Sequence, residues 1–172
     1  MMKQFTFTLL LFTLCTYALA QDFEIPEQAR FETVQDYKDY DELVLACSNW
    51  LVDTPLGQAE EKRIKANGFF LKWLTGAPHV SVGVQPYTLK LSENTHPMML
   101  MVFMAGWTNY VLSTGDNDDK VAANLAGLDF MMRFYTSNQV IIGKVKGMEK
   151  IIALRDKGKL KSYVKKRVAN GD

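Results

Sequence analysis

An almost uninterrupted apolar run near the middle of the chain constrains the fold more than any other feature. Between Met98 and Val111, only Thr108 and Asn109 are clearly polar. A helix that is apolar on every side must be covered by neighbours on every side. The run is shorter than the about 20 residues that cross a bilayer. It therefore predicts a core helix over residues 97–113, surrounded by other helices.

The segments on both sides carry the one-sided apolar pattern of helices that cover such a core. Their apolar residues recur at steps of three and four positions, as in an amphipathic helix. Thr33 and Thr54 stand at the first two starts, where a side-chain oxygen accepts the free backbone donors of the first turn. The predicted helices span residues 33–53, 54–75, 120–136, 144–156 and 160–168.

Residues 80–91 interrupt this helical rhythm. Apolar and polar or small side chains alternate on both sides of Gln85-Pro86, which is typical of a β-hairpin or of an extended crossover. The alternating residues are Val80, Val82, Val84, Tyr87, Leu89 and Leu91. The fold class predicted for the whole chain is all-α: an antiparallel bundle of five to six helices with a short extended or β-hairpin insert near 80–91.

The first 20 residues are typical of a cleavable secretory signal peptide. Lys3 precedes an apolar stretch, and Ala18–Ala20 has the small-residue pattern that a signal peptidase cleaves. We therefore expect cleavage after Ala20, a flexible leader over residues 21–32 and one helical domain over residues 33–172. The expected location is the periplasm or the medium, with no transmembrane segment left after cleavage.

The charges of the remaining chain are balanced in number but not in position. Residues 21–61 hold 11 acidic and 2 basic side chains, whereas residues 143–172 hold 10 basic and 3 acidic ones. We interpret the two ends as solvated helix faces, with docking on an anionic surface as the alternative. Nucleic acid is not expected as a partner, because no aromatic residues interleave with the lysines. Cys47, the one remaining thiol, has the helical spacing of a buried residue.

No motif in the chain predicts catalysis. The chain contains neither a nucleophile elbow, a paired-histidine zinc helix nor a glycine-rich phosphate loop, and its two histidines are His79 and His96. Three asparagines near apolar helix faces are interpreted as structural hydrogen-bonding groups, with a small-ligand pocket as the alternative. They are Asn67, Asn109 and Asn124.

The segment 96–104 is the candidate metal site. Thioether sulfurs at three-residue spacing beside an imidazole match the soft ligands that Cu(I) prefers. The candidate ligands are His96, Met98, Met101 and Met104. Methionine also fills gaps in helical cores, so no cofactor is assigned and copper is kept as an alternative.

Three segments resemble a family of exported, uncharacterised helical proteins of Gram-negative bacteria: Phe69–Pro78, Ala122–Gly127 and Lys157–Leu160. They are packing and capping motifs, and the resemblance implies an exported helical domain without implying an activity. The predicted function is therefore a non-enzymatic exported protein that binds a protein partner in the cell envelope or supports envelope structure. A small-ligand or copper carrier that uses the methionine-rich helix 96–104 is the alternative.

Overall fold

The computed structural model describes residues 23–171, and the regular secondary structure of this part is entirely helical. The predicted signal peptide, residues 1–20, lies outside the described residues. The helices are α1 (Val34–Asp39), α2 (Asp41–Asp53), α3 (Glu60–Gly76), α4 (Pro86–Glu93), α5 (Met98–Thr114), α6 (Lys120–Ser137), α7 (Gln139–Ile142), α8 (Lys146–Asp156) and α9 (Leu160–Asn170). The predicted all-α class is confirmed for these residues.

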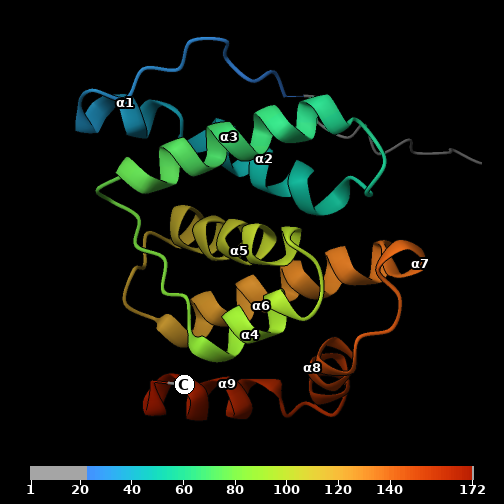
Figure 1. Ribbon diagram of the computed structural model, residues 1–172. Helices are drawn as coiled ribbons and strands as arrows, with labels where there is room; N and C mark the ends of the chain where they lie inside the picture. The colour runs from blue at the N-terminus through green and yellow to red at the C-terminus, as the bar shows by residue number, and fades with distance from the viewer. Residues whose placement is uncertain (1–22, 172) are drawn as a thin grey trace, which may run out of the picture.

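The helices form three layers (Figure 1). Helices α1, α2 and α3 lie on one side, α5 and α6 form the middle, and α4, α8 and α9 lie on the opposite side. Helix α5 is the predicted core helix. Its buried residues occur all around the helix, as the apolar run requires; they include Met99, Val102, Phe103, Ala105, Trp107 and Val111.

The contact between α5 and α6 is the most extensive one between two described helices. It is made at two glycines, where the backbones approach closely. A Cβ atom at Gly106 would lie 2.6 Å from the carbonyl oxygen of Ala126, and a Cβ atom at Gly127 would lie 2.9 Å from that of Phe103. Real Cβ atoms do not reach such distances, so each position accepts only glycine without a shift of the partner helix.

The expected number of five to six helices is too low, because 23–171 contains nine. The predicted first helix is interrupted at Tyr40, which ends α1 and precedes α2. The predicted helix start at Thr54-Pro55 is also wrong, since α3 begins at Glu60. The intervening backbone is held by the buried Arg63, whose guanidinium donates to the carbonyl oxygens of Leu51, Thr54 and Pro55.

The insert at 80–91 contains no strand. Its first half, residues 80–85, has no regular structure, and Pro86 then starts α4, where the missing N–H of proline costs nothing. The buried residues of α4 are Thr88, Leu91 and Ser92, which follow helical spacing, while Leu89 is 41% exposed. In the second half of the insert, the alternation of apolar residues therefore wrongly indicated a strand, because the residues from Pro86 onward are helical.

Residues 23–32, predicted as a leader, form no helix. Phe23 is 5% exposed and its ring centroid lies 5.7 Å from that of Trp50. Phe31 stacks on Tyr37 at 5.1 Å. No helix between residues 23 and 171 is long and apolar enough to span a membrane.

We expect Gly106→Ala and Gly127→Ala each to lower the free energy of unfolding by about 1–3 kcal/mol, the usual cost of overpacking a core. Urea denaturation measures this change. Gly68→Ala is the matched control, because Gly68 lies in α3 and a Cβ atom there meets nothing within 4 Å. The control should be neutral or stabilising by up to about 1 kcal/mol. Equal effects at all three positions would contradict the close contact of α5 and α6.

Candidate functional site

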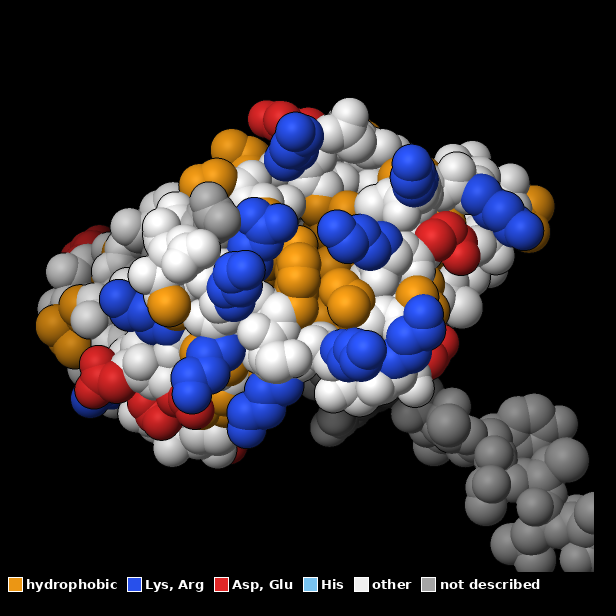
Figure 2. Space-filling model, turned by 90° about the horizontal axis from the view of Figure 1, so that it is seen from below, with side chains coloured by type: hydrophobic (Ala, Val, Ile, Leu, Met, Phe, Trp, Pro, Cys, Tyr) orange, Lys and Arg blue, Asp and Glu red, His pale blue; other side chains and the backbone are white. Residues whose placement is uncertain are grey.

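A hollow of about 670 Å³ lies between α4, α8 and α9, and we call it the α4–α8–α9 groove. Seen from the side of α9, apolar side chains form its centre and lysine and arginine side chains surround them (Figure 2). Its twelve lining residues are Pro86, Tyr87, Lys90, Leu91, Asn94, Val145, Lys146, Gly147, Lys150, Ile151, Tyr163 and Arg167.

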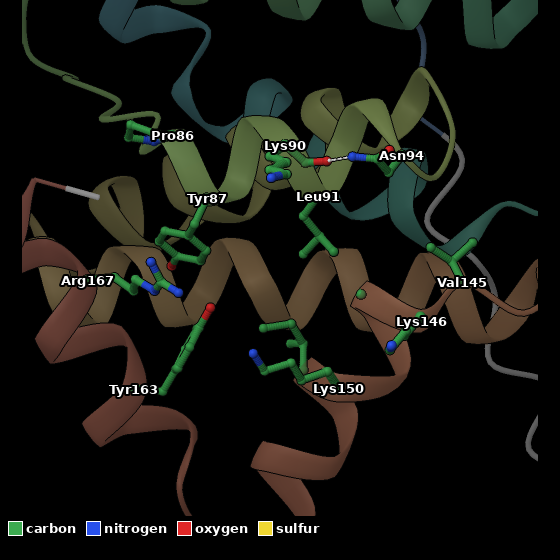
Figure 3. Close-up of a pocket in the computed structure, with 12 residues that line it drawn as sticks. Pro86, Tyr87, Lys90, Leu91, Asn94, Val145, Lys146, Lys150, Tyr163 and Arg167 are labelled. Atoms are coloured by element: carbon green, nitrogen blue, oxygen red, sulfur yellow. Dashed lines mark hydrogen bonds between the residues drawn. The ribbon is translucent and has the colours of Figure 1, made fainter.

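The floor of the groove is apolar and belongs to the core. Leu91 of α4 and Ile151 of α8 both line the groove and are 8% and 3% exposed, and Leu91 points into the groove (Figure 3). Gly147 allows α8 to approach α4 at this point, because a Cβ atom there would lie 2.7 Å from Cδ1 of Leu91. The groove therefore offers a continuous apolar surface beneath an opening to solvent.

The rim of the groove is cationic. Lys90, Lys146 and Lys150 are exposed, and within residues 23–171 none of them forms an ion pair with a carboxylate. Arg167 adds a fourth positive charge at the α9 end. A smaller hollow of about 320 Å³ adjoins this end and is lined by Tyr163, Lys166, Arg167 and Asn170. The rim thus concentrates positive potential around an apolar centre.

Two tyrosines form one end wall of the groove. The rings of Tyr87 and Tyr163 meet edge to face with centroids 5.9 Å apart, and the guanidinium of Arg167 lies 5.1 Å from the Tyr163 centroid. This arrangement is visible at the left of Figure 3, with Val145 and Lys146 at the opposite end. Such cation–π contacts help to hold the arginine in place.

Tyr87 is fixed by a buried partner. Its hydroxyl donates to Oδ1 of Asn124 at 2.8 Å, and the Asn124 amide donates to the carbonyl oxygen of Lys120. Burial raises the pKa of Tyr87 above its usual value; the nearby Tyr163 also raises it, whereas Arg167 lowers it. The phenol is therefore protonated at neutral pH and acts as a hydrogen-bond donor in the wall.

The lining of the groove has a distinct composition. Its twelve residues include no histidine, carboxylate, thiol, serine or threonine. It combines an apolar surface, four cations and two aromatic rings. These groups recognise a ligand that is apolar in one part and negatively charged in another.

The predicted copper ligands lie elsewhere. Met98, Met101 and Met104 are half-buried on α5 and pack against the core. The Asn67 amide donates to the Met98 sulfur at 3.3 Å, and the Met98 backbone N–H donates to Nδ1 of His96. His96 and Met98 are thus brought together. None of the four lines the groove. Burial lowers the pKa of His96, and the positive charge of Arg63 lowers it further.

The second histidine has a carboxylate beside it. Nε2 of His79 lies 2.9 Å from Oδ1 of Asp41, which ties the 77–85 segment to the start of α2, and the His79 ring meets Trp73 edge to face. Neither His79 nor Asp41 lines the groove. Within residues 23–171 no three histidine, cysteine, aspartate or glutamate side chains gather as a metal site would require.

The three asparagines do not form one network. Asn67 meets Met98, Asn109 donates to Asn49 at 3.5 Å, and Asn124 meets Tyr87. Asn124 alone therefore touches the wall of the groove. The sequence signal for the groove was the basic C-terminal end; the missing signal was α4, which supplies the facing wall.

Comparison with known proteins adds no relative. No protein-family model matches the chain, and neither a curated protein nor a solved structure matches it. The groove is therefore interpreted from its own residues.

The buried thiol of Cys47 should be chemically inert in the folded protein. Its side chain is fully buried and donates to the carbonyl oxygen of Ala66, and burial raises its pKa to about 12. At pH 8 the thiol is therefore protonated and enclosed, and iodoacetamide should modify it at least 100-fold more slowly than in urea. Mass spectrometry of a Cys15→Ala chain measures the rate. Equal rates in the folded and unfolded chains would contradict this burial.

Proposed function

We propose that this protein is an exported, non-enzymatic binding protein, periplasmic or secreted, whose α4–α8–α9 groove binds an anionic amphiphile. By this we mean a molecule with one acyl chain and a carboxylate or phosphate headgroup. One observation carries the proposal: an apolar hollow of about 670 Å³ is ringed by exposed lysines that lack carboxylate partners in the described chain. The signal-peptide pattern of residues 1–20 supports export.

The apolar floor of the groove matches the acyl chain of such a ligand, and the cationic rim matches its headgroup. A purely hydrophilic anion would leave the apolar surface of the lining in contact with water, and a purely apolar ligand would partly desolvate the lysines without pairing them. An acyl chain covers the floor while its headgroup reaches the rim. The volume lies within the about 300–1,000 Å³ typical of small-molecule sites.

A protein partner in the cell envelope is the alternative occupant. A docked protein buries about 800 Å² on each side of a stable interface and matches a broad surface. The groove is instead a hollow bounded by three helices and two tyrosine rings, so the smaller ligand fits it better. The candidate copper ligands of segment 96–104 do not line the groove, so the groove gives no support to a copper site.

Isothermal titration with four probes tests the proposal. Dodecanoate and dodecyl phosphate should bind, because each carries a chain and a negative charge. Dodecyl maltoside lacks the charge and acetate lacks the chain, so both should bind at least tenfold more weakly, a difference of about 1.4 kcal/mol. Equal binding of dodecanoate and dodecyl maltoside would overturn the charge requirement. Equal binding of dodecanoate and acetate would overturn the role of the apolar floor.

Charge reversal locates the site. Lys146→Glu combined with Lys150→Glu should weaken dodecanoate binding at least tenfold, because it replaces two rim cations with anions. Lys157→Glu combined with Lys161→Glu makes the same change of net charge at exposed positions outside the lining and should leave affinity within about twofold. Equal loss in both variants would show that net charge, rather than the groove, controls binding. Chains beginning at Gln21 serve as a parallel set, free of the apolar segment 1–20.

A further inference from the structure

A second feature is an exposed apolar tip on α7. Val140 is fully exposed and Ile141 is 62% exposed. The five other large exposed hydrophobic residues of the described chain are isolated from one another in sequence, so these two are the one adjacent pair. Helix α7 lies at one end of the molecule, beyond the C-terminal end of α6 (Figure 1). Its apolar side chains are thus available to an outside surface.

The tip is held rigidly. Asn138 is buried at its base, where its amide donates to the carbonyl oxygen of Phe134 and its Oδ1 accepts the Leu56 N–H at 2.7 Å. On the far side, the Tyr135 hydroxyl accepts the Val145 N–H at 2.9 Å and donates to Glu149. Anchored at both ends, the short helix presents Val140 and Ile141 outward instead of folding them onto the core.

The charges around the tip favour an anionic surface. Lys144 and Lys146 follow directly and are exposed. Glu149, the acidic residue closest to them in the sequence, accepts hydrogen bonds from Tyr135 and Gln139. Apolar side chains projecting beside lysines are the arrangement of segments that insert shallowly into anionic bilayers.

We infer that α7 is a membrane-contact tip, in which Val140 and Ile141 insert at the interface of an anionic bilayer while Lys144 and Lys146 bind its headgroups. A second copy of the chain fits less well, because two aliphatic side chains fall far short of the about 800 Å² per partner that a stable interface buries. With so few inserting groups, the contact is weak, reversible and sensitive to salt. Lys146 also lines the groove, so the tip and the groove share this one lysine, whereas Val140, Ile141 and Lys144 lie outside the lining.

Flotation with lipid vesicles tests the tip. The probes are vesicles of phosphatidylcholine alone and vesicles containing 30 mol% phosphatidylglycerol, a composition chosen to give anionic charge. The chain beginning at Gln21 should bind the anionic vesicles at least fivefold more strongly than the neutral ones. Val140→Ser combined with Ile141→Ser should lower that binding at least fivefold without changing charge. Ile64→Ser is the matched control, because Ile64 is 70% exposed on α3, and it should bind as the parent does.

Two further results decide the outcome. The Val140→Ser, Ile141→Ser variant should retain its dodecanoate affinity and its urea midpoint, which shows that the loss of vesicle binding is not a folding defect. Lys144→Gln should weaken binding to the anionic vesicles and leave binding to the neutral ones unchanged, because it removes one positive charge. Lys144 lies outside the groove, so this loss would not come from the groove. Equal vesicle binding by the parent and the double serine variant, or an equal loss in Ile64→Ser, would overturn the inference.

Discussion

The structure depends on the close approach of α5 and α6 at Gly106 and Gly127. A side chain at either glycine would collide with backbone of the opposite helix, so this contact fixes how the two central helices pack. The outer layers then cover them from both sides: α2 and α3 on one, and α4, α8 and α9 on the other. The groove exists because three helices of the second layer converge on this fixed centre and leave a hollow between their outward faces.

The sequence predicted the fold where the pattern was local. The apolar run over 97–113 gave α5 within one residue at each end, and Thr33 with Asp36 forms the capping box typical of a helix start. The predictions were wrong where side chains from other parts of the sequence determine the local structure. The 54–59 turn is held by Arg63 from α3 and by Asn138, 82 residues from Leu56. Such long-range hydrogen bonds leave no trace in periodicity.

The site was predicted only in part, for a related reason. The basic C-terminal end was visible in the sequence, because charge is a local property. Residues 80–91 were predicted to form a β-hairpin or an extended crossover, so α4 was not expected as the facing wall and the lysines were interpreted as a solvated face. The methionines of α5 match the ligand chemistry of a Cu(I) site, yet they are half-buried where α5 packs against the core. Composition identified the groups, and only the fold showed which of them share a surface.

In the proposed complex, an acyl chain lies on Leu91 and Ile151 while its charge meets the lysine rim. The most direct measurement is the change in backbone amide chemical shifts of the ¹⁵N-labelled protein on titration with dodecanoate. The proposal predicts saturable shifts concentrated in α4, in the first two turns of α8 and around Tyr163 and Arg167 of α9, with little change in α2 and α3. Shifts centred on Met98 and Met101, or spread evenly over the chain, would contradict it.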